Sequence, residues 1–180
     1  PERKQQIICS RSFGEEVFSL EQLEGAVTAF STTAAGKLRA QASLANCVQV
    51  FARTSPFTKS EPYSGARIIA LPFPSSDTRD IAQAALAGLR SLYREGPAYA
   101  KAGVVLSQFV ERGSITGDLF APKPRQGSDE LMRVIDVINA KQGRGAVRLA
   151  RDTAGGAWSM RREMLSPAYT TNWKELPKAH

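Results

Sequence analysis

Hydrophobic and polar positions alternate with two different periods along the first part of the chain. A two-residue period predicts strands at Gln6–Phe13, Cys47–Arg53, Ala66–Phe73 and Tyr99–Phe109. Apolar residues at steps of three and four predict two helices, one starting at Ser19 and one at Asp77. Their apolar positions are Leu20, Leu23, Val27, Phe30, Ala34 and Leu38 in the first, and Ile81, Ala85, Leu89 and Leu92 in the second. The predicted order is βαββαβ, which is an α+β fold.

Each helix has a single apolar stripe, so both should cover one face of a four-stranded antiparallel sheet and leave the other face open. The alternation predicts which side chains lie on each face. On the last strand, Ala102, Val104 and Leu106 should face the helices, while Lys101, Gly103, Val105 and Ser107 face outward. On the second strand, Val48, Val50 and Ala52 should face inward, and Gln49, Phe51 and Arg53 outward.

The amino-acid composition of the sequence changes after Arg112. Residues 113–128 are rich in Gly, Pro and Ser, which predicts a linker, and a small mixed extension covers 129–180. Within the extension we expect a helix at Asp129–Asn139, with Leu131, Val134, Ile135 and Ile138 on its apolar side. The segment Gly143–Ala150 predicts a strand, and Trp158–Trp173 is basic and aromatic with weak periodicity. The predicted organisation is therefore a domain at 1–112, the linker and the extension.

The charge balance favours a polyanionic partner, most simply nucleic acid. The net charge is +7 and the pI about 9.7, although a solvated basic surface without a specific role would give the same values. Cys9 and Cys47 have no metal-ligand spacing and are expected to be buried free thiols. The only histidine is His180, so we expect no catalytic or metal site in this segment. No apolar run approaches the roughly 20 residues that cross a bilayer, so we expect a soluble protein without a membrane partner.

The end of the first strand combines the donors that phosphate oxygens accept. Ser10, Arg11 and Ser12 supply hydroxyls, a guanidinium and peptide N–H groups, and Lys101 and Arg53 should lie on neighbouring strands. Alternation places Arg11 opposite the two serines unless a bulge intervenes. A phosphate-binding face and an ordinary exposed strand end both fit this pattern. Base stacking of the RNA-recognition type is poorly supported, because only Phe51 is a plausible outward aromatic residue.

Several stretches together resemble the C-terminal part of UmuC-type proteins, the catalytic subunits of DNA polymerase V in the Y-family of translesion polymerases. They are "ICSRSFGEEV", "VFARTSPF", "SDTRDI", "YAKAGVVLSQF" and "RREMLSPAYTTNW". The resemblance implies that residues 1–112 form a little finger, which grips the DNA backbone without reading sequence. It implies that the chain is a fragment, with the catalytic palm and its magnesium upstream, so that the fragment holds no cofactor and does not polymerise.

The resemblance also implies positions and partners. Ser10, Arg11, Ser12 and Lys101 match DNA-contact positions, and Arg53 and Arg67 are added because alternation predicts that they point outward. The wider setting would be error-prone lesion bypass in an SOS-type damage response, in a bacterial cytoplasm near the nucleoid. A different class of function, a protein–protein adaptor with a non-functional basic surface, remains an alternative.

Two further segments, one in the linker and one in the extension, are expected to bind partner proteins. The linker carries "TGDLF", Thr116, Gly117, Asp118, Leu119 and Phe120, which resembles a sliding-clamp motif, but Thr116 stands where glutamine is usual. This departure predicts weak clamp binding, and a hydrophobic pair folded back on its own domain is the alternative. The extension is implied to bind a processed UmuD-type subunit and the RecA filament. Four of its large side chains could bind these partners or could equally form a small satellite core; they are Trp158, Met164, Tyr169 and Trp173.

Overall fold

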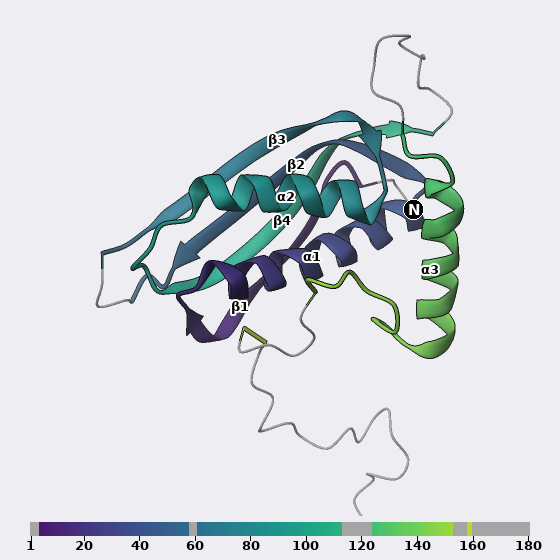
Figure 1. The fold of residues 1–180 in the computed structure, drawn as a ribbon. Helices are drawn as coiled ribbons and strands as arrows, with labels where there is room; N and C mark the ends of the chain where they lie inside the picture. The colour runs from purple at the N-terminus through teal and green to yellow at the C-terminus, as the bar shows by residue number, and fades with distance from the viewer. Residues whose placement is uncertain (1–3, 58–60, 113–123, 153–157, 160–180) are drawn as a thin grey trace, which may run out of the picture.

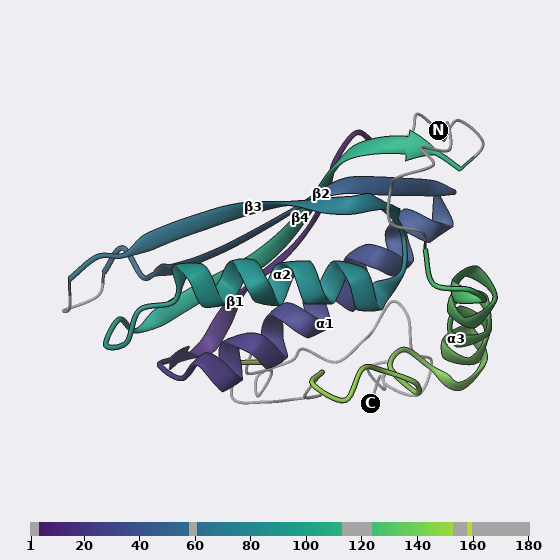
Figure 2. The same ribbon diagram turned by 45° about the horizontal axis from the view of Figure 1, so that its top comes forward.

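The computed structural model describes residues 4–57, 61–112, 124–152 and 158–159. A four-stranded antiparallel sheet in the order β1-β4-β2-β3 is covered on one face by two helices, α1 and α2, and a third helix, α3, lies at one end of the sheet (Figures 1 and 2). The elements are β1 (Ile7–Val17), α1 (Leu20–Ala40), β2 (Ser43–Thr54), β3 (Ser64–Ser75), α2 (Thr78–Leu92), β4 (Tyr99–Glu111) and α3 (Ser128–Gln142). The predicted βαββαβ order and the α+β fold are confirmed.

Both covering helices begin at the predicted residues. The Ser19 hydroxyl accepts a hydrogen bond from the Gln22 N–H at 3.3 Å, and the Asp77 carboxylate accepts one from the Arg79 N–H at 2.8 Å. The apolar stripe of α1 is buried from Leu23 to Leu38, and α2 buries Ile81, Ala85, Leu89 and Leu92. Local capping and helical periodicity therefore determine where these helices lie and which sides they bury.

The assignment of the two sheet faces is also confirmed. Val48, Val50 and Ala52 on β2, and Ala102, Val104 and Leu106 on β4, are completely buried beneath the helices. These two strands are central, because β4 pairs with both β1 and β2. Cys9 and Cys47 are buried and free, as the sequence predicts.

The strands are longer than the periodicity indicates. β1 continues to Val17, across a register shift between Ser12 and Val17 that includes Gly14. A bulge adds residues on one strand only, so the period of two is lost while pairing continues. Phe13 in this irregular part packs against the core, as expected.

α3 is held to the main domain mainly by polar contacts, and its predicted apolar stripe is largely exposed. Leu131 and Val134 are exposed, Ile135 and Ile138 are half-buried, and Met132 is the buried residue of the helix. The anchor is a bidentate ion pair in which Arg39 of α1 donates to Asp136 at 2.6 and 2.7 Å. The predicted apolar side of this helix is therefore only partly buried, and the Arg39–Asp136 ion pair holds α3 against α1.

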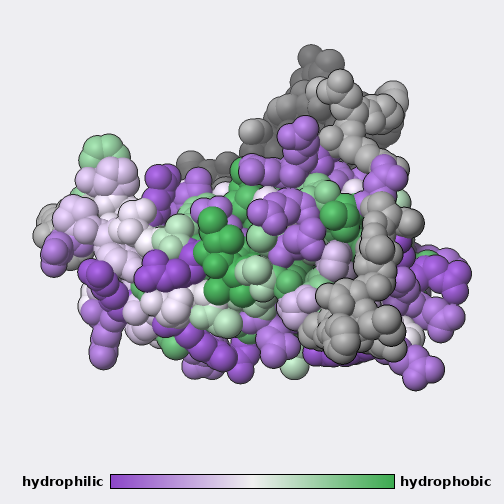
Figure 3. All heavy atoms as spheres, turned by 90° about the horizontal axis from the view of Figure 1, so that it is seen from above, coloured by the Kyte–Doolittle hydropathy of each residue, from purple (hydrophilic) through white to green (hydrophobic). Residues whose placement is uncertain are grey.

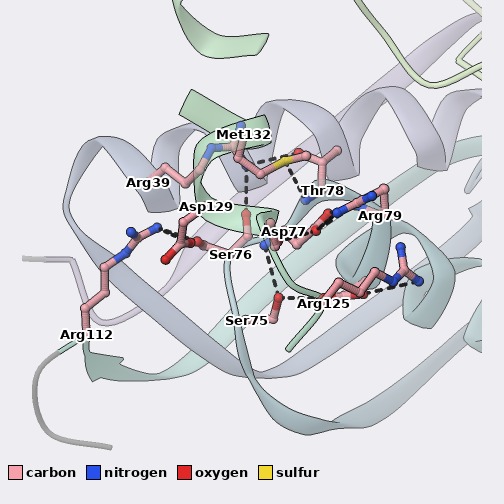
Figure 4. A network of polar contacts seen from close by, with 12 residues as sticks. Arg39, Ser75, Ser76, Asp77, Thr78, Arg79, Arg112, Arg125, Asp129 and Met132 are labelled. Atoms are coloured by element: carbon pink, nitrogen blue, oxygen red, sulfur yellow. Dashed lines mark hydrogen bonds and ion pairs between the residues drawn. The ribbon is translucent and has the colours of Figure 1, made fainter. Parts of the chain in front are cut away.

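A network of polar side chains joins α3 to the start of α2 (Figure 4). Ser128 donates to the Asp77 carboxylate at 2.5 Å, and Arg39 donates to the Ser76 carbonyl and the Thr78 hydroxyl. Arg112, at the end of β4, donates to the Ser76 hydroxyl at 3.0 Å and lies 3.2 Å from Asp129. The first helix of the extension is thus tied to the sheet domain on several sides.

The segment after α3 is not the predicted strand. Residues 143–151 form turns, with positive φ at Gly143 and Gly145. The Asn139 side chain donates to the Val147 carbonyl and accepts from its N–H, both at 2.9 Å. The Asn139 amide therefore binds the Val147 backbone groups that a neighbouring strand would bind in a sheet. The apolar pattern of residues 143–150 does not show this interaction.

The chain then returns along α1 (Figure 1). Arg151 forms an ion pair with the buried Glu24 of α1, which also binds Arg90 of α2 at 2.7 Å. Trp158 is only 8% exposed and meets Phe30 edge to face, with ring centroids 5.6 Å apart. In the described part of the chain, no helix combines the length and the apolar character that crossing a membrane requires.

Candidate nucleic-acid interface

Strand pairing brings four donor side chains into one row across the open face of the sheet. Ser12 of β1 pairs with Lys101 of β4, Lys101 with Arg53 of β2, and Arg53 with Ser64 of β3. Directly paired residues share a face, and the buried neighbours of this row face the helices, so the row lies on the open face. We call Ser12, Lys101, Arg53 and Ser64 the basic row. The predicted proximity of Lys101 and Arg53 is confirmed.

The next row along the sheet is closely packed around Gly103. Ser10, Gly103, Phe51 and Ala66 follow one another from β1 to β3. A Cβ atom on Gly103 would lie 2.4 Å from the Ser10 Cβ and 2.6 Å from the Phe51 ring. The missing side chain thus allows the Phe51 ring to lie over the centre of the open face.

The third row is mostly apolar and was not singled out from the sequence. It consists of Ile8, Val105, Gln49 and Ile68, and its outer members are 56% and 66% exposed. Figure 3 looks onto the open face and shows hydrophobic residues gathered near its middle, with hydrophilic residues around them. The open face therefore has a basic row toward one end and an apolar centre, and it is not uniformly basic.

Two predicted contact residues lie on the other face. Arg11 pairs with Ala102, so it points to the helix side of β1, as simple alternation implies. Arg67 pairs with Val50, and its Cβ lies near Gly88 of α2. The expectation that Arg67 points outward is wrong, because alternation along β3 places Arg67 on the same side as Ile69 and Leu71, which pack against the core. Ser64 takes its place in the basic row.

A cluster of aromatic residues fixes the end of the sheet that carries the basic row. The Tyr99 ring packs on Tyr63 and Tyr93, and the Tyr63 hydroxyl donates to the Leu92 carbonyl. Burial raises the pKa of Tyr99 above 10.0, although its hydrogen bond with the Arg94 backbone opposes this. Tyr99 therefore stays neutral and holds the start of β4, two residues before Lys101.

The side chains of the basic row are hydrogen-bond donors and cations. In the described ranges, no three His, Cys, Asp or Glu side chains are grouped as metal ligands. Hydroxyls, an ammonium and a guanidinium on rigid strands suit phosphate oxygens.

The other predicted site residues fall into two groups. Thr116 to Phe120, Met164, Tyr169 and Trp173 lie outside the described residues. Trp158 is buried against Phe30 within the main hydrophobic core, so it is neither an exposed partner anchor nor part of a separate satellite core.

Comparison with known proteins finds related sequences over almost the whole chain. Residues 4–119 match the model of the impB/mucB/samB family C-terminal domain, and residues 129–179 match a domain of unknown function, DUF4113. The chain is 43% identical to Protein ImpB of Salmonella typhimurium over 181 residues and 43% identical to Protein UmuC of the same species (strain LT2) over 175 residues. Protein MucB of Escherichia coli is 41% identical over 181 residues.

These matches cover 99%, 96% and 99% of the chain, but 42% of the length of each relative. The chain is therefore a C-terminal domain with an appended segment, of the kind found in UmuC-like proteins. It belongs to the impB/mucB/samB family, and the resemblance inferred from its motifs is confirmed.

Solved structures were matched at lower similarity. A complex of beta-clamp processivity factor and the little finger domain of PolIV has a TM-score of 0.41 at 12% identity, covering 64% of this chain and 98% of that one. An insertion ternary complex of Dbh DNA polymerase has a TM-score of 0.45 at 10% identity, covering 62% of this chain and 32% of that one.

Proposed function

We propose that the open face of the sheet grips the backbone of primer–template DNA without reading its sequence, as the little finger of a translesion DNA polymerase. The observation that carries this proposal is the basic row, in which Lys101 and Arg53 are adjacent on the two central strands and serines flank them. The family membership supports it, and the net charge of +7 favours the same partner.

Backbone contacts suit this role because phosphates are the same at every base pair. Lys and Arg neutralise phosphates and release counterions, which gives affinity that does not depend on sequence but falls steeply with salt. Ser10, Ser12 and Ser64 add neutral hydrogen bonds that position the backbone. A polymerase that must accept distorted templates needs such a grip.

The test measures binding of fluorescent primer–template duplexes of two unrelated sequences across a range of salt concentrations. Lys101→Ala and Arg53→Ala should each weaken both duplexes alike and lower the log–log salt slope by about one unit. Arg67→Ala is the matched control, because it removes one positive charge from the same sheet on the helix side. We expect its slope to stay close to that of the parent.

Two outcomes would contradict the proposal. Equal losses for Arg67→Ala and Lys101→Ala would mean that total charge, and not the open face, decides binding. Binding that is absent or insensitive to salt would favour the adaptor alternative, whose basic surface has no function.

In the whole parent protein, we propose template-directed DNA synthesis past lesions during an SOS-type damage response, in the bacterial cytoplasm. The nucleotidyl transfer would use magnesium held by palm carboxylates upstream of this segment. The parent should extend a primer past a template lesion, whereas the 180-residue chain should bind the same duplex and add no nucleotide.

The segments outside the described residues suggest further partners, and we propose weak binding of the sliding clamp through Leu119 and Phe120. Changing both to alanine should abolish clamp binding in a pull-down or fluorescence assay. Thr116→Gln should strengthen it by supplying an amide that can form hydrogen bonds. Equal binding by the double alanine variant would exclude this segment. A processed UmuD-type subunit and the RecA filament remain proposed partners of the extension.

A further inference from the structure

A groove of about 510 Å³ lies on the side of the molecule away from the open sheet face. Its walls are α1, α3 and the returning chain at residues 144–152, and Figure 1 shows these three segments next to one another. Most of the surface that lines the groove is apolar, and its apolar side chains, among them Ala29, Leu131, Ile135, Val147 and Leu149, alternate with threonines and charged residues. Its size falls within the range of sites that take a small molecule or a few side chains.

The returning chain forms a fixed wall with two arginines. Because Asn139 binds both the N–H and the carbonyl of Val147, the turn that carries Arg144 and Arg148 has a defined shape. Both guanidinium groups belong to exposed residues that border the groove, one on each side of Val147. An apolar floor and cationic rim are thus placed together by specific hydrogen bonds.

The rim keeps a positive charge after the ion pairs of the described residues are taken into account. Arg39 and Arg79, which also border the groove, are neutralised by Asp136 and Asp77. The Lys37 ammonium lies 3.6 Å from the Cys9 sulfur of β1, so its positive charge points toward that strand. Asp152 also borders the groove and interacts electrostatically with Arg148, so it offsets one positive charge. Arg144 has no carboxylate partner among the salt bridges of the described residues.

We propose that this groove is a docking site for an acidic peptide segment of a partner protein, with one bulky apolar side chain against the apolar surface and flanking carboxylates on Arg144 and Arg148. This inference does not depend on the proposed grip on DNA, since the groove and the basic row lie on opposite sides of the sheet. Carboxylates form bidentate hydrogen bonds with arginine, and an apolar anchor supplies contact area.

Charge argues against the other occupants. The tail at 160–180 contains four Lys or Arg and two Glu residues, so it carries the same sign of charge as the rim. A second copy of the chain has a net charge of +7 and would also be repelled. A DNA phosphate would match the rim, but it would leave the apolar floor unfilled.

The experiment uses the full 180-residue chain and a short fluorescein-labelled peptide with a central Leu flanked by Asp residues. Fluorescence anisotropy should give a Kd of roughly 10–100 μM, weakening as salt is raised. A peptide with Lys in place of Asp, and one with Ser in place of Leu, should not bind. Failure of the parent chain to bind the acidic peptide would overturn the proposal, including the case in which the chain's own tail fills the groove.

Two kinds of variant test the location. Gly36 borders the groove within α1, and the nearest atom to a Cβ placed there is Arg39 Nη2 at 4.0 Å. Gly36→Leu should therefore project into the groove and block the peptide, whereas Gly36→Ala should bind like the parent. The double variant Arg144→Ala and Arg148→Ala, at exposed positions, should bind about tenfold more weakly.

The DNA-face variant Lys101→Ala is the control for nonspecific charge and should keep full affinity for the peptide. Unchanged binding in both Gly36→Leu and the double arginine variant would overturn the proposal. Competition by duplex DNA for the groove, seen as loss of DNA binding in the double arginine variant but not in Lys101→Ala, would assign the groove to nucleic acid instead.

Discussion

Two glycines of this chain, Gly103 in a strand and Gly36 in a helix, have opposite effects on the stability of the fold. Gly103 lies on a central strand where Ser10 and Phe51 approach too closely for a Cβ atom. Gly36 lies inside α1 with space around it. The first is required by packing, whereas the second weakens its helix, because glycine has more backbone freedom to lose on folding.

We expect opposite effects from alanine at these two positions. Gly103→Ala should lower the free energy of unfolding by about 1–3 kcal/mol, because the new methyl group forces β1 and the Phe51 ring away from β4. Gly36→Ala should raise it by about 0.5–1 kcal/mol. Urea denaturation of the two variants and the parent measures both values. A neutral Gly103→Ala would show that Phe51 does not lie over this position.

At the level of elements, the start of α2 is where the extension meets the sheet domain (Figure 4). Burial alone raises the pKa of Asp77, but hydrogen bonds from Arg79 and Ser128 outweigh it and hold the pKa below its ordinary value of 3.8. The ionised carboxylate therefore caps the start of α2 and, through its hydrogen bond with Ser128, joins the start of α3 to it. This contribution to stability is present above the unfolded pKa and is lost as the pH falls through the folded pKa.

Asp77→Asn should therefore destabilise the protein by about 1–2 kcal/mol near neutral pH. The difference between parent and variant should shrink as the pH is lowered below about 4, because the parent's carboxylate is then protonated. Thermal unfolding followed by circular dichroism over this pH range measures it. Asp129→Asn, the same change at an exposed carboxylate, is the control and should have a smaller effect. A constant difference between parent and Asp77→Asn at all pH values would contradict the argument.

The contact between the extension and α1 gives a second prediction at this scale. Trp158→Ala should lower the free energy of unfolding by about 2–4 kcal/mol, since it uncovers Phe30 and leaves a cavity. Trp158→Phe should recover part of the loss by keeping an aromatic ring. If Trp158 were an exposed partner anchor, Trp158→Ala would unfold at the same temperature as the parent.

For the whole molecule, these contacts join two segments, residues 4–119 and 129–179, which separate family models match. We expect the two segments to unfold as one cooperative unit. Trp158 is part of the main core, Met132 is buried at the start of α2, and the buried Glu24 binds arginines from α2 and from the extension. Such shared burial couples the unfolding of the two segments.

We therefore expect a single thermal transition for the chain, with circular dichroism and tryptophan fluorescence giving the same midpoint. A midpoint for fluorescence well below that for the helical signal would show that the extension detaches before the sheet domain unfolds. Arg151→Ala should move both signals together, because it leaves the Glu24 carboxylate with only one partner.

The sequence by itself determined the order of elements, the starts of α1 and α2 and the buried side of each central strand. These features follow from local capping and from periods of two and 3.6 residues, which are properties of a few neighbouring residues. Family membership also followed from short motifs. Lys101 and Arg53 could be placed together because both lie on central strands whose inner residues are plainly apolar.

Only the tertiary structure decided the features that depend on pairing between distant residues. Only the pairing of β3 with β2 showed that Arg67 lies on the helix side and that Ser64 lies in the basic row, because both alternating sets of residues in this edge strand include apolar side chains. The Arg39–Asp136 ion pair oriented α3, and Asn139 replaced the predicted strand by a turn. The groove arises from these same contacts, since its walls come from segments that are far apart in sequence and meet only when the chain has folded.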